Sequence, residues 1–432
     1  MKHVVKVGEF LHKNYKILML FFMICIIAFD VIVIIEHPMD LTEGGSSTWW
    51  AITKNVENGN GYKSCEVAYI PNCEMTNQAT AIREPLPVFI YVFVGLFTEN
   101  LPMAFQLTQM VFNLLICWFV FLLAEELGNR VLALISAFIW AFYLPTLRVE
   151  AHMSGDVIAG LFVIMGVLYF TRAVKGNSKR DWMLFGLLFG LAILSRSSTL
   201  MIALALLGSV VVYFLILKQL LSAGRLQGLL VAIIVLGATV SPWVVRNMLV
   251  FGKPILGTTL VGYNLYRHNA IVVTEVIPHY VGSDEGSQEI NALVARIPEL
   301  LTPINEAQVD AIFQREALKI IANHRGEYAE LVLFRFLPLW FNIGVLEQYG
   351  QTMMVLDYIV VIQQAILLFI FLVALWKGDW FLRLLALSVP VFMFGYLAID
   401  SQLRYMLPVM PLIISISVVG ASRSFVPHTP YT

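Results

Sequence analysis

Charged side chains are scarce in this chain of 432 residues. Asp, Glu, Lys and Arg make up 13% of it, whereas hydrophobic residues make up 59%. Apolar side chains in that proportion exceed what one water-facing core can bury, which excludes an ordinary soluble domain. Apolar runs of about 20 residues, long enough to cross a bilayer as a helix, recur along the chain. The sequence therefore predicts a polytopic membrane protein. The formal net charge of −1 says nothing about partners.

Motifs of soluble nucleotide enzymes and of metal sites are also missing. The chain has no P-loop, no Gly-x-Ser-x-Gly turn and no dinucleotide fingerprint, so nothing indicates a soluble nucleotide as substrate. No histidine of the predicted far-side segments has a second ligand at i, i+4, which favours a structural or solvated role for each. No cofactor is assigned, and the use of a divalent cation stays open. These histidines are His37, His152, His268, His279 and His324.

Cysteine is rare as well. Cys25 and Cys117 lie inside apolar runs, whereas Cys65 and Cys73 share the first long polar segment. If that segment faces an oxidising compartment, a disulfide can join the second pair. The sequence leaves both the bridged and the reduced state open.

Basic residues predict the side on which each loop lies. Lysines at 2, 6, 13 and 16 precede the first apolar run, about 17–35, which is long for a signal peptide and lacks a cleavage site. The N-terminus is therefore expected in the cytoplasm and the polar stretch 36–85 on the far side. The same rule places the basic loop at 172–180 and the C-terminus inside.

The remaining runs predict about ten spans, counted by length and hydropathy. A short apolar segment at 86–98 is expected to be re-entrant or interfacial, and a second far-side region covers about 248–350. That region contains a helical pattern at 306–323 and an aromatic, interfacial segment at 328–341. Full spans are expected at about 101–124, 131–147, 157–170, two around 195–198, 226–240, 354–375, 381–398 and 405–421.

Ionisable groups collect where the predicted spans reach the far side. A single charge at such a place most simply lies in headgroup water, but seven on one face favour a shared polar cavity. Asp30, inside the first apolar run, needs a partner or water; a hydrogen bond to a neighbouring helix is the simpler interpretation, and a role in the cavity is the alternative. The seven groups are Asp40, Glu43, Arg83, Glu84, Asp156, Arg246 and Arg404.

Prolines at these exits predict breaks or kinks in the helices. Pro85, Pro242 and Pro408 would each free backbone groups toward the cavity. Trp243 and Tyr405 beside them are most simply aromatic belt residues at the membrane interface.

Several motifs together resemble a known family, the GT-C superfold glycosyltransferases. Within it the resemblance is strongest to bacterial family 39-like enzymes, which include lipid A aminoarabinose and galacturonic acid transferases and protein O-mannosyltransferases. It covers nearly the whole chain. The motifs are Arg83-Glu84-Pro85 at the end of the first loop, the run 186–196, Pro242-Trp-Val-Val-Arg246-Asn247, Gly262-Tyr-Asn-Leu-Tyr266 and Arg404-Tyr405-Met-Leu-Pro408.

The resemblance implies an all-α polytopic membrane protein with the GT-C fold. It would have about ten membrane helices, at most about twelve, and two large extracytoplasmic loop regions. It also suggests three parts. Residues 1–247 would form a GT-C transmembrane module with its first loop at 36–100, residues 248–350 an extracytoplasmic or interfacial region, and residues 351–432 the C-terminal membrane helices.

The implied activity is transfer of a sugar, with inversion, from a polyprenyl phosphate carrier to an acceptor lipid, glycan or protein outside the cytoplasm. Nucleic acid is not an expected partner. The protein is expected in the cytoplasmic membrane with both termini inside. In the family an acid of the first loop activates the acceptor hydroxyl, but here Ser46 and Ser47 stand near its place. The candidate bases are then Asp40, Glu43 and, in the second far-side loop, Asp156.

Arginine can hold a phosphate in a bidentate way, which makes the arginines of the far side candidates for the donor phosphate. Arg404 is the first candidate, followed by Arg83 and Arg246. Glu84, Tyr405 and Tyr266 are expected to line the same cavity.

Two other classes of protein remain as alternatives. A secondary transporter or flippase of lipid-linked or small solutes would need paired broken helices near mid-bilayer, whereas the polar residues here gather at one face and no internal repeat is visible. A lipid-modifying enzyme without sugar chemistry would need a metal-ligand set with a nucleophilic Thr or Ser, or a His with a nearby acid.

Overall fold

A computed structural model describes residues 10–11, 13–42, 44–150, 152–216, 223–273, 284–343 and 355–423. Over these ranges the chain is all-α, and the only β contact is an isolated bridge between Lys63 and Ala79. The predicted fold class is confirmed.

Seven helical segments within these ranges are long and apolar enough to cross a membrane. The number of spans stays a prediction, because three shorter apolar helices accompany them: α4 (Pro85–Gly95), α6 (Arg130–Ala141) and α21 (Met410–Ser422). The seven segments are α2 (Tyr15–Glu36), α5 (Leu101–Leu127), α8 (Asp156–Gly176), Ser197–Ile216 with α10 (Leu200–Ile216), Gly224–Phe251 within α11 (Ala223–Phe251), α18 (Val355–Lys377) and Trp380–Leu397, made of α19 (Trp380–Ala386) and α20 (Ser388–Leu397).

Apolar burial divides these helices into central and peripheral ones. The side chains of α21 are buried almost throughout, and this helix packs against α18, α5 and α6. Helix α9 (Lys179–Ser195) packs against α8 and α11. On α2, α11 and α18 large apolar side chains are exposed, as expected for helices that face lipid.

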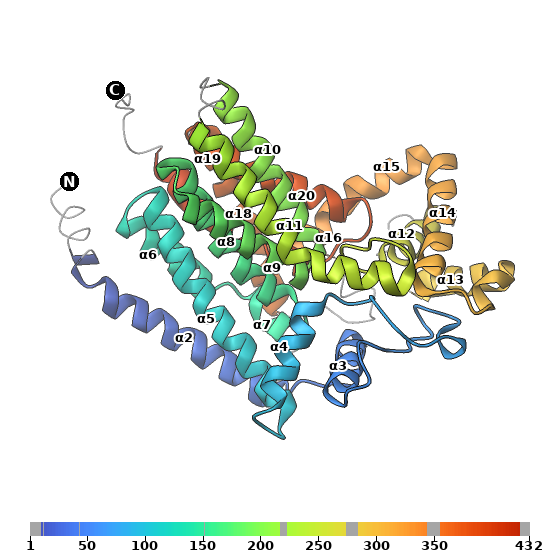
Figure 1. The fold of residues 1–432 in the computed structure, drawn as a ribbon. Coiled ribbons are helices and arrows are strands. Elements are labelled where there is room, and N and C mark those ends of the chain that lie inside the picture. Colours follow the sequence, from blue (N-terminus) through green and yellow to red (C-terminus); the bar gives the residue numbers. More distant parts are fainter. Residues whose placement is uncertain are drawn as a thin grey trace.

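The helices of the two polar regions gather at one end of the bundle (Figure 1). They are α3 (Gly44–Glu57), α12 (Val261–Asn269), α13 (Asp284–Arg296) and α14 (Glu306–Asn323), and α15 (Arg325–Phe334) follows. Side chains of the first loop, α12 and α14 share one hydrophobic core. The two polar regions predicted from the sequence therefore pack on each other.

Helix α14 has the bounds predicted from its apolar pattern, and a capping box explains where it begins. The Asn305 side chain accepts from the Gln308 N–H, and the Gln308 side chain accepts from the Asn305 N–H. Two N–H groups that a helix start leaves without partners are thereby satisfied.

The predicted span up to Leu147 is wrong. Helix α6 ends at Ala141, and a separate short helix, α7 (Pro145–Glu150), begins after a break. Pro145 disfavours a helical conformation in the residue before it. Gln363 of α18 satisfies the interrupted backbone, because its Nε2 donates to the Phe142 carbonyl at 2.8 Å and its Oε1 accepts from the Leu144 N–H at 3.2 Å.

The predicted helix end before Pro242 is also wrong, because α11 continues through Pro242 to Phe251. Proline cannot donate to the carbonyl four residues earlier, which is that of Ala238. The Ser241 hydroxyl donates to this carbonyl at 3.0 Å instead. A neighbouring side chain thus replaces the missing hydrogen bond, as is common in membrane helices.

The segment predicted to be interfacial at 328–341 forms α15 and α16 (Phe336–Phe341) and is partly internal. Arg335, Leu339 and Trp340 are buried. The Trp340 indole donates to the Gln364 carbonyl of α18 at 3.0 Å. Packing against the bundle holds one side of this segment, and its interfacial position stays a prediction.

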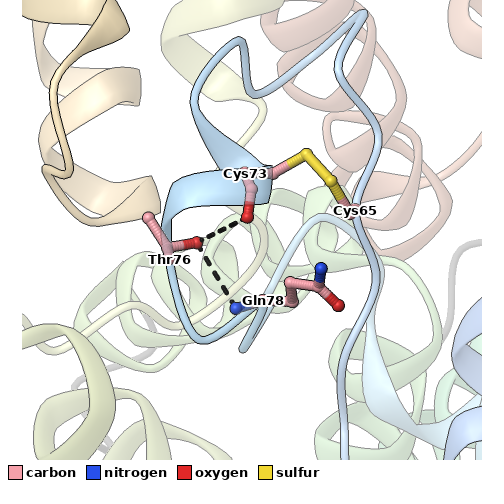
Figure 2. Close-up of a disulfide and its surroundings, with 4 residues drawn as sticks. All are labelled: Cys65, Cys73, Thr76 and Gln78. Carbon is pink, nitrogen blue, oxygen red and sulfur yellow. Dashed lines mark hydrogen bonds between the residues drawn. A yellow bond between two sulfur atoms is a disulfide. The ribbon is translucent and has the colours of Figure 1, made fainter.

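Cys65 and Cys73 form a disulfide. Figure 2 shows the chain turning back after it, where the Thr76 hydroxyl donates to the Cys73 carbonyl at 3.0 Å and accepts from the Gln78 N–H at 3.3 Å. Within the closed loop, the buried Asn72 amide donates to the carbonyls of Thr302 and Ile304. The bridge therefore constrains the loop that joins the two polar regions.

Candidate active site

Charged and tyrosine side chains from distant parts of the sequence meet where α8 begins. Asp156, at the start of α8, is 1% exposed, and its Oδ1 lies 3.1 Å from Nε of Arg196. The same Nε donates to the Tyr396 hydroxyl at 3.2 Å. We call this group the ion-pair cluster; its members are Glu84, Asp156, Arg196, Tyr396, Asp400, Arg404 and Tyr405.

Tyr405 lies between the two arginines of this cluster. The guanidinium carbons of Arg196 and Arg404 are 5.0 and 5.1 Å from its ring centroid, within cation–π range. Tyr396 stacks on the same ring at 4.7 Å. The Tyr405 hydroxyl donates to Oδ2 of Asp400 at 2.7 Å. Arg404 itself is exposed, so a ligand can reach its guanidinium.

Asp400 also faces a buried arginine and a buried histidine. His268 Nε2 lies 3.5 Å from Asp400 Oδ2. Burial lowers the pKa of His268 to about 4, so this imidazole is neutral at pH 7. Arg335 is fully buried and donates to the carbonyls of His268, at 2.5 Å, and Leu397, at 3.1 Å. It supplies the buried positive charge on this side of Asp400.

Glu84 connects the cluster with the turn after α9. Its Oε1 accepts from both the N–H and the hydroxyl of Ser197, each at 2.9 Å. The same turn approaches the start of α8 closely, since a Cβ on Gly155 would lie 2.3 Å from the Ser195 carbonyl oxygen. Glycine at position 155 therefore allows the contact that brings Asp156 to Arg196.

Arg246 fastens the first far-side loop to α11. Its Nη1 donates to the Thr80 carbonyl at 2.8 Å and its Nη2 to the Tyr62 carbonyl at 3.1 Å. The Tyr62 hydroxyl in turn donates to the carbonyls of Arg83 and Glu84 at 3.0 and 3.1 Å. These bonds hold Glu84 near the cluster. Phosphate binding by Arg246 stays a prediction.

The other residues predicted for the site lie around the cluster. Arg83 lies 5.8 Å from the rings of both Trp49 and Tyr69. Asp40 is exposed and accepts from the N–H and hydroxyl of Thr42, both at 2.7 Å. Among the remaining predictions, Tyr266 packs against Phe313 in the core shared with α14, and Glu43 lies outside the described residues. Asp30 is buried in α2 beside Asn113.

Two neighbouring acids of α14 hold the first loop and α12. Glu306 accepts from the Ala81 N–H at 2.8 Å and from the Thr259 hydroxyl. Asp310 accepts from the N–H groups of Gly262 and Tyr263, at 2.7 and 3.1 Å, where α12 begins. Burial raises the pKa of both carboxyl groups to about 7.

These raised pKa values predict that the free energy of unfolding falls as the pH rises toward about 7. Between about pH 4 and 7 the folded protein keeps protons on Glu306 and Asp310, whereas the unfolded chain has lost them. The folded state is therefore more stable at the acidic end of this range, by up to a few kcal/mol. The double substitution Glu306→Gln and Asp310→Asn should flatten the dependence. The measurement is thermal unfolding in detergent from about pH 6.5 to 8. Lower pH is avoided, because below the ordinary histidine pKa of 6.5 the lowered pKa of His268 changes the free energy of unfolding in the opposite direction.

The matched control for this pH dependence is Glu299→Gln, since Glu299 is exposed. It should leave the slope of the wild type unchanged. An equal slope in the wild type and the double variant would contradict the assignment.

Over the described ranges, no three His, Cys, Asp or Glu side chains gather in a way that could hold a metal ion. The acids brought together in the ion-pair cluster are instead used by arginine, serine and tyrosine partners. No step is assigned to a divalent cation, and the use of one stays a prediction.

Sequence reasoning missed four members or supports of the cluster: Arg196, Tyr396, Asp400 and Arg335. Two signals in the sequence could have indicated Arg196 and Asp400. Arg196 ends an apolar run, and Asp400 lies at the same membrane exit as Arg404. Tyr396 and Arg335 sit in apolar, aromatic surroundings where no local pattern marks them.

Comparison with known proteins supports the family resemblance. The family model of dolichyl-phosphate-mannose-protein mannosyltransferases matches residues 85–245, which include Asp156 and Arg196. No curated protein sequence matches the chain.

Solved structures from Archaeoglobus fulgidus share the fold. The apo oligosaccharyltransferase of Archaeoglobus fulgidus is similar with a TM-score of 0.57 and 16% identity, over 94% of this chain and 50% of that one. AglB of the same organism, in complex with an inhibitory peptide and a dolichol-phosphate, has a TM-score of 0.51 and 14% identity over the same shares. ArnT from Cupriavidus metallidurans bound to undecaprenyl phosphate has a TM-score of 0.41 and 12% identity, over 94% and 77%.

The chain thus spans about half the length of the archaeal proteins. Their fold extends over nearly all of it, and the family model covers the part that contains Asp156 and Arg196. The resemblance to GT-C glycosyltransferases that the motifs indicate is confirmed, and the chain has the GT-C fold.

Proposed function

We propose that this protein is a membrane glycosyltransferase that moves a sugar from a polyprenyl phosphate carrier to an acceptor lipid, glycan or protein. The observation that carries the proposal is the ion-pair cluster. It assembles acids and arginines from the residue before α4, the start of α8, the turn after α9 and the segment Leu403–Met406 in a GT-C fold. The dolichol-phosphate bound to AglB supports the choice of carrier.

The proposed step is a single displacement. The acceptor hydroxyl oxygen forms a bond to the anomeric carbon while the bond from that carbon to the phosphate oxygen breaks, which inverts the configuration. The electron pair leaves with the polyprenyl phosphate, and the hydroxyl proton passes to a carboxylate. Because the leaving group gains negative charge, the protein must mainly stabilise that charge and position the acceptor.

We assign acceptance of the hydroxyl proton to Asp156 and binding of the donor phosphate to Arg404. Asp156 is the predicted base that lies inside the ion-pair cluster, whereas Asp40 is exposed and bonded to Thr42. Arg404 is exposed beside the Tyr405 hydroxyl, 3.5 Å from it, and a guanidinium holds phosphate well. Arg83 and Arg246 remain further candidates for the same charge.

Two observations support an extracytoplasmic site. The first loop carries the Cys65–Cys73 disulfide, which is typical of oxidising compartments. Helix α8 runs from Asp156 to Arg172 and Lys175, so the cluster and a basic loop lie at opposite ends of one membrane helix. The proposed location is the cytoplasmic membrane, with both termini inside.

The test is sugar transfer by the purified full chain in lipid nanodiscs. Radiolabelled polyprenyl phosphate sugars should yield labelled acceptor together with free polyprenyl phosphate. In the same assay Arg404→Gln should raise KM for the donor by about 10-fold or more, because a charge-assisted hydrogen bond to phosphate is lost. Arg383→Gln is the matched control, as Arg383 is exposed and donates to the Trp376 carbonyl.

An unchanged KM in Arg404→Gln would remove this arginine from the phosphate site. Uptake of the lipid-linked sugar or another solute into liposomes, without transfer, would overturn the proposed activity in favour of a transporter.

A further inference from the structure

The turn between α9 and α10 determines where the Arg196 guanidinium lies. Arg196 itself has extended backbone angles, with φ −154° and ψ 105°, and the short helix η2 (Ser197–Thr199) follows it. Its long side chain leaves the end of α9 and reaches Asp156 at the start of the neighbouring helix α8. Arginine has many rotamers, so this position has to be maintained by neighbouring groups.

Tyr396 contacts this turn at two points. Its hydroxyl accepts from Nε of Arg196 at 3.2 Å and is hydrogen-bonded to the Ser198 hydroxyl at 2.6 Å. The ring is itself held in place, since it stacks on Tyr405 and meets Phe392 edge-on at 5.2 Å. A rigid aromatic ring of α20 thus presents one hydroxyl to both the side chain of Arg196 and the turn that carries it.

Glu84 holds the same turn from the other direction. Its carboxylate accepts from the N–H and hydroxyl of Ser197, the residue between Arg196 and Ser198. Glu84 is 6% exposed and precedes α4. The turn is therefore hydrogen-bonded to α20 through Ser198 and to the first loop through Ser197, and Arg196 stands next to both bonds.

We infer that Tyr396, with Glu84, is a positioning residue that holds the Arg196 guanidinium against Asp156. This rests on the proposed function, in which Asp156 accepts the proton. Tyr396 acts through Arg196 and does not touch the reacting atoms. The reason such a contact matters is geometric, because a displacement of about 1 Å in a catalytic arrangement can cost about 100-fold in rate.

The first measurement is the kinetics of Tyr396→Phe in the transfer assay. This substitution keeps the ring stack and removes only the hydroxyl. We expect kcat to fall about 10-fold or more while KM for the donor changes less than about twofold, since Arg404 is untouched. Ser198→Ala should cause a smaller fall in kcat, and Ser198→Thr, which restores a hydroxyl, should recover the loss.

Tyr328→Phe is the matched control. Its hydroxyl donates to the Ala398 carbonyl at 3.0 Å, next to the same end of α20, without contact to Arg196. It should lose a comparable hydrogen bond and keep the kcat of the wild type. A structural role alone would lower the thermal stability of both tyrosine variants and leave kcat per folded molecule unchanged.

The second measurement does not depend on activity. Phenylglyoxal modification of Arg196 is followed by peptide mass spectrometry, with exposed Arg404 as the internal reference. Loss of one hydrogen bond of about 1 kcal/mol should raise the modification rate of Arg196 relative to Arg404 about fivefold in Tyr396→Phe. The rate ratio should not change in Tyr328→Phe.

The two measurements separate the two hypotheses. A raised Arg196 modification rate with no sugar transfer by the wild type would support the positioning of Arg196 and refute the proposed function. Transfer by the wild type, together with an unchanged kcat and an unchanged modification rate in Tyr396→Phe, would overturn the inference about Tyr396.

Discussion

Asp156→Asn should reduce sugar transfer by about 10² to 10⁴-fold, the usual contribution of a general base. Asparagine has nearly the same shape and keeps an oxygen for the Arg196 Nε, 3.1 Å from Asp156 in the wild type. It cannot accept the acceptor proton at neutral pH. The fall should appear in kcat, with the chain still inserted and folded, and it is measured as labelled product formed per folded molecule.

Asp181→Asn is the matched control for this substitution. Asp181 also lies in the first turn of a helix, α9, but in the basic segment that begins with Lys179 and Arg180. Its replacement should leave transfer unchanged. Glu43→Gln provides the second comparison, since Glu43 is also among the acids predicted as base. Wild-type rates in both Asp156→Asn and Glu43→Gln would refute the assignment of the base to either acid.

Arg335→Met should destabilise the folded protein by about 2 kcal/mol or more, because two carbonyls lose a buried donor and the buried Asp400 loses a nearby positive charge. Burial lowers the pKa of Arg335 to about 10, so the guanidinium is still charged at pH 7. Methionine would leave Asp400 without this neighbouring charge. The carbonyls of His268 and Leu397 would also lose their donors. The free energy of unfolding in mixed detergent micelles measures the effect.

Arg325→Met is the control, at the first residue of α15, the helix that ends just before Arg335. Arg325 is exposed, and its Nε donates to the Ala322 carbonyl at 3.2 Å. Solvent can replace that bond, so we expect a loss of less than about 1 kcal/mol. Equal losses in the two variants would show that Arg335 does not balance a buried charge.

The helices that could be predicted from the sequence are those whose local pattern agrees with their environment. Long apolar runs indicated α2, α5 and α18, and the apolar spacing of 306–323 gave the bounds of α14. Prediction was wrong around two prolines, Pro145 and Pro242. In one case Gln363, far along the chain, satisfies the broken backbone, and in the other Ser241 replaces the lost hydrogen bond. The effect of a proline on a helix depends on such partners.

The candidate site could be predicted only in part. Charges at membrane exits indicated Asp156, Glu84 and Arg404, because an ionisable group near lipid is costly and stands out in an apolar sequence. The same signal could not show that Arg246 donates to loop carbonyls while Arg196 pairs with Asp156. Each of these outcomes depends on which backbone or side-chain group lies within about 3 Å, and spacing along the chain does not determine that distance.

The sequence by itself determined that this protein lies in a membrane, that its polar segments gather in two long regions, and that its motifs resemble those of GT-C glycosyltransferases. Hydrophobicity and the placement of charge act locally, so they can be read from the order of residues alone. Only the tertiary structure decided which acid meets which arginine. It also decided that Tyr405 lies between Arg196 and Arg404 and that the Tyr396 hydroxyl accepts from Arg196. These contacts join residues up to 209 positions apart, as Arg196 and Tyr405 are. They form because close packing of α4, α8, α9 and α20 leaves each buried polar group few partners.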